Sequence, residues 1–102
     1  MDDTAAFVDR YLTETAEIAA RTSRGDLARV ITILFDAYRA GRDVYTCGNG
    51  GSAANASHLA CDLAKFTACE GKPRLRAMSL CDNAALLSAL TNDEGFGRIF
   101  AA

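Results

Sequence analysis

Apolar side chains recur every three to four residues in two consecutive stretches near the start of the chain. The first stretch runs from residue 2 to about residue 22, and the second carries the stronger period. The apolar positions of the second stretch are Leu27, Val30, Ile31, Leu34, Phe35 and Tyr38. This period is typical of a helix with one apolar face. Ser23 and Asp26 have the spacing of a capping box, and Gly41 stands where a helix-ending glycine belongs, so we predict two successive helices.

The pattern changes after the second predicted helix. Residues 43–47 form a short β-branched and aromatic run, and residues 75–80 form a second apolar run, so each predicts a strand. The Ala-rich stretch 52–66 predicts a helix between these strands. Asp82 can cap a further helix that continues through Leu90.

The predicted order, helix–helix–strand–helix–strand–helix, indicates an α/β fold with a parallel sheet and crossover helices. We interpret residues 1–41 as N-terminal helices that serve packing or oligomerisation, and residues 42–102 as the start of a doubly wound parallel sheet. Two strands do not complete such a sheet, and residues 97–102 resemble the beginning of a helix without a helix-ending signal. We therefore expect either the first part of a longer domain or a chain that depends on other chains.

Composition and charge narrow the possible partners and the cellular compartment. The chain has 102 residues, half of them apolar and a quarter charged, which allows one globular domain at most. Its net charge of −2 gives no electrostatic footprint for nucleic acid or an anionic membrane. The first ten residues are acidic where a signal peptide would be basic, and no apolar run approaches the span of a bilayer. The four cysteines form no CxxC pair, so we expect reduced thiols in a cytoplasmic protein.

Three glycines occupy four positions between the first predicted strand and the following helix, in the sequence CGNGGS. Glycine lets the backbone take positive φ angles and lets a ligand approach with no Cβ in the way. The N–H groups at a helix start and the helix dipole favour an anionic or oxygen-rich ligand, and Ser52 can either cap the helix or donate its hydroxyl to that ligand. A tight connection would need one glycine, so we favour a ligand site at the carboxyl ends of the strands.

The same turn formally matches the GxGxxA fingerprint of dinucleotide-binding proteins, through Gly48, Gly50 and Ala53. The acidic residue expected at the end of the next strand is poorly placed, because Asp82 follows that strand. No lysine follows the glycines, which excludes a nucleotide P-loop. A dinucleotide-binding half-domain is therefore the weaker interpretation of this turn.

The predicted helix after the glycines carries a polar stripe made of Asn55, His58, Asp62 and Lys65. His58 and Asp62 are four residues apart, a spacing that lets two side chains reach one metal ion or one substrate. Spacing alone favours an ordinary surface hydrogen bond between them. The glycine turn makes a ligand-binding role for this pair a closer alternative to the surface hydrogen bond, because the polar stripe begins where a ligand would lie.

Four segments together resemble the N-terminal half of a SIS (sugar isomerase) domain: GNGGSAANASH at 48–58, LACDL at 59–63, LCDN at 80–83 and NDEGF at 92–96. Within that group the chain is most similar to phosphoheptose isomerases, which interconvert sedoheptulose 7-phosphate and glycero-manno-heptose 7-phosphate. The resemblance implies a sheet with flavodoxin-like layering and a phosphorylated sugar as ligand. It also implies a homo-oligomer, a tetramer in that family, with the N-terminal helices packed between subunits.

The resemblance further implies roles for individual residues. In phosphoheptose isomerases the position of His58 is a zinc ligand, and the position of Asp62 carries a glutamate that binds zinc and substrate. That carboxylate is the base that moves a proton between adjacent carbons through an enediol, so Asp62 is the implied catalytic residue. The implied substrate-binding positions are Asn49, Gly50, Gly51, Ser52, Asp62, Asn92 and Asp93.

Two departures from the family pattern bear on activity. Asp62 is one methylene shorter than the family's glutamate. The family's serine- and threonine-rich phosphate loop, and the Gln and His that complete its zinc site, would lie beyond residue 102, so we expect these 102 residues alone not to turn over substrate. The alternative is a non-catalytic SIS protein that binds or senses a phosphosugar, such as a DnaA initiator-associating protein. Those relatives lack a carboxylate at the position of Asp62, which favours the enzyme.

Overall fold

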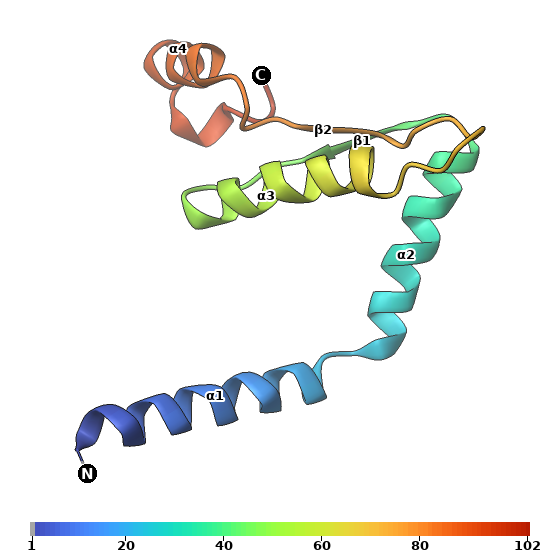
Figure 1. The fold of residues 1–102 in the computed structure, drawn as a ribbon. Helices are drawn as coiled ribbons and strands as arrows, with labels where there is room; N and C mark the ends of the chain where they lie inside the picture. Colours follow the sequence, from blue (N-terminus) through green and yellow to red (C-terminus); the bar gives the residue numbers. More distant parts are fainter. Residues whose placement is uncertain (1) are drawn as a thin grey trace. The chain divides into compact units, whose positions relative to one another are not determined.

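The computed structural model describes residues 2–102 and has the predicted order of elements (Figure 1). The elements are α1 (Asp3–Arg21), α2 (Arg24–Arg39), β1 (Asp43–Thr46), α3 (Gly51–Cys61), a π-helical turn (Asp62–Phe66), β2 (Arg76–Ser79), α4 (Ala84–Glu94) and a 3₁₀ turn (Phe96–Arg98). The α/β class and the parallel pairing of the two strands are confirmed.

The chain divides into two compact units, Met1–Thr32 and Ile33–Ala102, with the boundary inside α2. The separate roles assigned to residues 1–41 and 42–102 stay predictions. The predicted signals at the ends of α2 are confirmed: the N–H of Asp26 donates to Ser23 Oγ at 3.1 Å, and Gly41 has a φ of +66°. The N–H of Gly41 donates to the carbonyl of Tyr38, and that of Arg42 to the carbonyl of Ala37. These two bonds are those of a Schellman motif, which glycine accommodates without strain.

The apolar faces of α1 and α2 are open to solvent. None of the residues that the structure describes in these two helices is buried. The large exposed side chains are Phe7, Val8, Tyr11, Leu12 and Ile18 in α1, and Leu27, Val30, Ile31, Ile33 and Phe35 in α2. Each of the two helices therefore carries a stripe of exposed apolar side chains among the residues that the structure describes.

The core of the second unit lies where α3 packs alongside β1 and β2 (Figure 1). The strands pair in parallel, with Val44 opposite Ala77 and Thr46 opposite Ser79. Ala56 and Ala60 of α3 are buried, because their small side chains let the helix approach the sheet closely. Thr46 Oγ1 donates to the carbonyl of Ala56 at 2.7 Å and ties the end of β1 to α3.

Two predicted helices differ from the observed ones. The helix predicted at 52–66 ends its α-helical part at Cys61, and a π-helical turn follows in which the N–H of Thr67 donates to the carbonyl of Asp62. The cap of α4 is Asn83 rather than Asp82, since Asn83 Oδ1 accepts the N–H of Leu86 at 2.9 Å. After α4, the tail forms only a 3₁₀ turn before residue 102.

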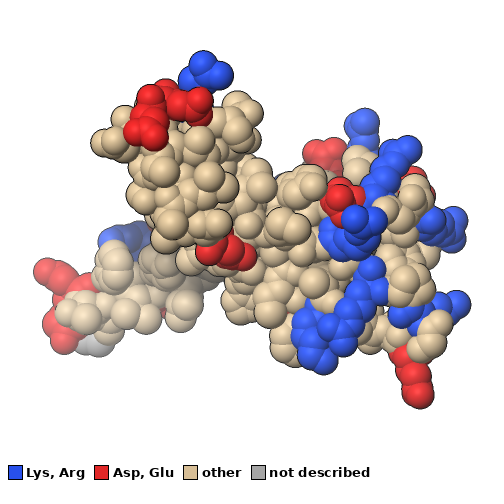
Figure 2. Space-filling model, turned by 90° about the horizontal axis from the view of Figure 1, so that it is seen from above, with Lys and Arg blue, Asp and Glu red and all other residues tan. Residues whose placement is uncertain are grey.

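Basic side chains gather on one side of the face seen in Figure 2, with large uncharged areas beside them. Arg76, at the start of β2, places its Nε 2.8 Å from Asp43 Oδ1 and donates to the carbonyl of Gly41. These contacts lie at the amino ends of the strands, whereas the glycine turn lies at their carboxyl ends.

None of the helices among the described residues is long and apolar enough to cross a membrane.

Candidate functional site

The three glycines of the turn are present for different reasons. A Cβ on Gly48 would lie 2.4 Å from the backbone of Ser52, so only glycine lets the start of α3 come this close. Gly50 has a φ of +57°, a conformation that favours glycine. Gly51 has neither constraint, and a Cβ there would meet nothing within 4 Å. Local folding thus explains two of the glycines, whereas at Gly51 it requires no glycine and the space beside the backbone is open.

The start of α3 leaves backbone amides of the glycine turn without partners among the described residues. Gly50 is the N-cap of α3 and makes no side-chain cap bond, so the interpretation of Ser52 as the cap is wrong. The first backbone bonds of the helix run from the N–H of Ser52 to Asn49 and from the N–H of Ala53 to Gly50, both at 3.0 Å. The N–H groups of Gly50 and Gly51 have no acceptor among the described residues. Unpaired amides at a helix start, aided by the helix dipole, suit an anion or a sugar oxygen.

His58 and Asp62 lie side by side on the exposed surface of α3 and the π-helical turn. His58 Nε2 is 3.4 Å from Asp62 Oδ2, and the two side chains are 77% and 46% exposed. The predicted pairing of these residues is therefore present as a contact, open to any ligand from solvent. Within residues 2–102, no group of three or more His, Cys, Asp or Glu side chains could hold a metal ion.

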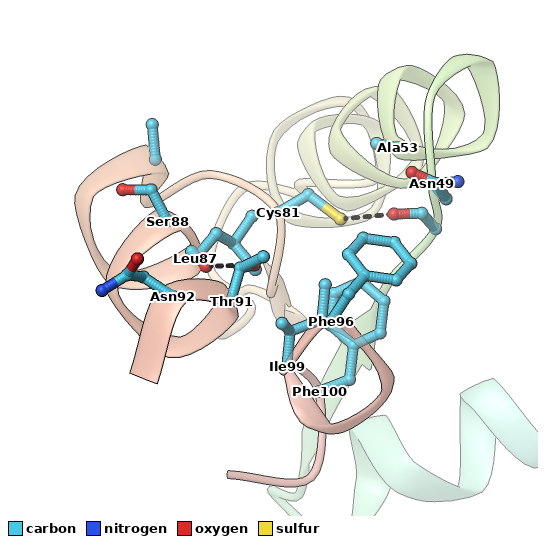
Figure 3. A pocket seen from close by; sticks show the side chains of 12 residues that line it. Asn49, Ala53, Cys81, Leu87, Ser88, Thr91, Asn92, Phe96, Ile99 and Phe100 are labelled. Atoms are coloured by element: carbon cyan, nitrogen blue, oxygen red, sulfur yellow. Dashed lines mark hydrogen bonds between the residues drawn. The ribbon is translucent and has the colours of Figure 1, made fainter. Parts of the chain in front are cut away.

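A cavity of about 600 Å³ lies between the glycine turn and α4 (Figure 3). Its polar wall includes Asn49 from the turn and Asn92 from α4. The other lining residues are Gly48, Ala53, Cys81, Ala84, Leu87, Ser88, Thr91, Phe96, Ile99 and Phe100. The fold thus brings together two predicted substrate-binding residues that are far apart in the sequence.

The remaining predicted residues lie outside the lining of this cavity. Gly50, Gly51 and Ser52 are at the start of α3, beside Asn49. Asp93 is in the last turn of α4, where its Oδ1 accepts the amide of Asn92 at 3.0 Å. The His58–Asp62 pair stands further along α3.

Several cavity residues were not predicted. Phe96, Ile99 and Phe100 lie below Asn49 in Figure 3 and form an apolar floor of the cavity. Their spacing of three and four was the available signal, and it was interpreted only as the beginning of a helix. Cys81 is another lining residue without a predicted role, and its Sγ donates to the carbonyl of Gly48 at 3.2 Å.

Comparison with known families decides the class of this fold. The SIS domain family matches residues 8–102. The chain belongs to the SIS domain family. The resemblance inferred from the GNGGS and NDEGF segments is thereby confirmed.

Relatives and solved structures of this SIS chain include several phosphoheptose isomerases. The phosphoheptose isomerase of Solidesulfovibrio magneticus is 40% identical over 104 residues, which cover 99% of this chain and 45% of that protein. The phosphoheptose isomerase of Chlorobaculum parvum is 36% identical over 92 residues, which cover 89% of this chain and 44% of that protein. The lincomycin biosynthesis protein LmbN of Streptomyces lincolnensis is 42% identical over 93 residues, which are 91% of this chain and 34% of that protein.

Two solved phosphoheptose isomerases share the fold at 26% identity. GmhA from Neisseria gonorrhoeae has a TM-score of 0.79 and matches 96% of this chain and 49% of its own. The enzyme from Francisella tularensis has a TM-score of 0.81 and matches 99% of this chain and 53% of its own. The chain therefore spans between about a third and a half of the length of these proteins.

Proposed function

We propose that this chain forms the sugar-phosphate-binding half of a phosphoheptose isomerase. The observation that carries the proposal is the open backbone at Gly50 and Gly51, where two unpaired amides meet the N-terminus of α3 in a SIS fold. Oxygen atoms of a phosphorylated sugar are suitable acceptors for such amides. The similarity to phosphoheptose isomerases supports sedoheptulose 7-phosphate as the ketose.

We assign a separate binding role to each polar side chain around the turn. Asn49 and Asn92, which line the cavity, are the side chains proposed to bind sugar hydroxyls, and the Asn92 amide also donates to Asp93 Oδ1. Ser52, which does not cap α3, keeps its hydroxyl for the ligand. The apolar floor of the cavity excludes water from one side of the sugar.

Asp62 is the proposed base of the isomerisation. A carboxylate removes the proton from the carbon next to the carbonyl, which leaves an enediolate, and returns it to the neighbouring carbon, while a second proton moves between the two oxygens with the help of an acid outside these 102 residues. Transfer requires hydrogen-bond contact between carboxylate and substrate. Because aspartate is one methylene shorter than the family's glutamate, the sugar must lie closer to α3 than it would beside a glutamate.

Zinc is part of the same proposal. Ligands of tetrahedral zinc with bonds of about 2.0–2.1 Å lie about 3.3–3.4 Å apart, and the His58–Asp62 separation of 3.4 Å suits two of them. The described residues supply no further ligand group, so this pair is proposed as half of a site. When bound, zinc supplies a positive charge that stabilises the oxyanion of the enediol.

A homo-oligomer in the cytoplasm, with a tetramer as the expected state, also belongs to the proposal. The exposed apolar stripes of α1 and α2 support subunit packing through these helices, since exposed apolar surface of this kind marks interaction sites.

Calorimetric titration of the chain with sedoheptulose 7-phosphate tests the proposal. In a version of the protein that also supplies the rest of the SIS domain with its phosphate loop, we expect binding that requires the phosphate group, and unphosphorylated sedoheptulose is the control ligand. Gly51→Ala should weaken binding about tenfold or more by placing a Cβ in the ligand's path. Gly97→Ala is the matched control, because a Cβ there also meets nothing within 4 Å and lies outside the turn.

The result that contradicts the proposal is an absence of binding, or equal affinity in the wild type and Gly51→Ala. Binding that is never accompanied by isomerisation, in any version of the protein that also supplies the rest of the SIS domain, would favour the phosphosugar-binding alternative.

A further inference from the structure

Two consecutive side chains after β2 contact the glycine turn and the helix α3 that follows it. Cys81 Sγ donates to the carbonyl of Gly48 at 3.2 Å, although 33 positions separate the two residues. Asp82 Oδ1 accepts the hydroxyl of Ser57, which lies 25 positions earlier in α3. The loop 80–83, which we call the brace, therefore contacts both the glycine turn and the helix that follows it.

The brace is itself anchored to the sheet. The N–H of Leu80 donates to the carbonyl of Thr46 at 2.8 Å, and the N–H of Cys81 donates to Ser79 Oγ at 3.1 Å. Ser79 is only 5% exposed, so its hydroxyl is held inside the core. The Cys81 thiol thus reaches the turn from a fixed base rather than from a free loop.

The contact to Gly48 falls where it fixes the geometry of the candidate site. Gly48 lies against Ser52 with no room for a Cβ, and the next peptide groups lead through Gly50 to the unpaired amides. Holding the Gly48 carbonyl limits rotation of those peptide groups. At its other end the brace runs into the Asn83 cap of α4, the helix that carries Asn92.

We propose that Cys81 is a positioning residue: its thiol holds the Gly48 carbonyl so that the amides of Gly50 and Gly51 face the ligand. For the identity of the ligand this inference rests on the proposed function. The brace joins the two walls of the cavity, so Cys81 couples the orientation of the turn to the position of α4.

Simple packing is the competing role for a half-buried cysteine, and three substitutions separate the two. Cys81→Ser keeps a donor and a similar shape, Cys81→Val keeps apolar bulk without a donor, and Cys81→Ala lacks both. A positioning role requires Ser to be the best replacement. A packing role requires Val to be at least as good as Ser, because valine better replaces the apolar volume of a thiol.

The first measurement is the dissociation constant for sedoheptulose 7-phosphate by calorimetry. We expect Cys81→Ser to stay within about twofold of the wild type and Cys81→Val and Cys81→Ala to bind about three- to tenfold more weakly, as loss of one hydrogen bond implies. Cys69→Ala, at an exposed loop cysteine, is the control and should bind as the wild type does. Wild-type affinity in Cys81→Val together with weakened binding in Cys81→Ser would overturn the inference.

A second measurement needs no ligand and separates this inference from the proposed function. In amide NMR spectra of the free chain, the resonances of Gly50 and Gly51 should move in Cys81→Ala and stay close to their wild-type positions in Cys81→Ser. If the wild type binds no sugar phosphate, the proposed function fails while this readout still decides the positioning role. Unchanged turn resonances in Cys81→Ala would contradict it.

If the variants do not fold, the alkylation rates of the four thiols in the wild-type chain test the contact between Cys81 and Gly48. Cys47, Cys61 and Cys69 are exposed, whereas Cys81 is partly buried and hydrogen-bonded. Alkylation by iodoacetamide, followed by mass spectrometry, should be slowest at Cys81, by about tenfold or more. Equal rates at all four thiols would show that the contact to Gly48 does not hold.

Discussion

The N-terminal helices and the glycine turn are both specified by strong sequence patterns, yet they are stabilised differently. Helix α1 is capped by Asp2, whose Oδ1 accepts the N–H of Ala5, and it has no buried residue among those described. The turn before α3 has no side-chain cap, but Cys81 of the brace donates to the carbonyl of Gly48, and Thr46 at the end of β1 donates to the carbonyl of Ala56 in α3. Local signals thus suffice to form α1, whereas the geometry of the turn depends on residues far away in the sequence.

The largest expected difference in stability is between replacing a glycine of the turn and replacing a glycine of α2. Gly48→Ala places a Cβ 2.4 Å from the Ser52 backbone and should lower the free energy of unfolding by about 3 kcal/mol. Gly25→Ala, whose Cβ would meet only Ser23 Oγ at 3.9 Å, should raise helix stability by about 0.5–1 kcal/mol. Urea unfolding followed by circular dichroism measures both. Effects of the same sign would contradict the contrast.

The second largest difference in stability is expected between replacing a buried alanine of α3 and replacing an exposed alanine of α1. Ala56→Leu adds volume where α3 meets the sheet and should cost about 1–3 kcal/mol. Ala16→Leu, on exposed α1, should change stability by less than about 0.5 kcal/mol, because nothing is displaced there. Thermal unfolding of the two variants side by side checks this, and an equal loss in both would show that α1 is packed in the same way.

The smallest contrast concerns the caps. Asn83→Ala removes the acceptor for the N–H of Leu86 and should destabilise α4 by about 1 kcal/mol. Asp2→Ala should instead fray α1 locally, with loss of helical signal but no shift in the main unfolding transition, since α1 buries nothing. A shift of that transition by Asp2→Ala would mean that α1 unfolds together with the second unit.

The elements that the sequence predicted correctly are those with local causes. Ser23 caps α2 and Gly41 ends it, through hydrogen bonds that join residues three to five positions apart. The choice between Asp82 and Asn83 as the cap of α4 could not be made locally, because both residue types cap well. Ser57, which lies in another helix, engages Asp82 and leaves Asn83 for the cap.

The site was predictable in its residue types but not in its construction. The family resemblance predicted that Asn49 and Asn92 both bind substrate, and both residues line the cavity between the turn and α4. The sequence could not show that Gly48 is needed for contact with Ser52, since that contact appears only when α3 packs back on the strand end. The apolar floor from Phe96 and Phe100 likewise depends on how the tail folds beneath the turn.

The most direct test of the central claim is an amide NMR titration of the chain with sedoheptulose 7-phosphate. A ligand bound at the glycine turn should move the resonances of Gly50 and Gly51 most, while those of α1 stay in place. Saturable shifts centred on these two amides would agree with the account. Shifts centred on any other part of the chain, or none at all, would contradict it.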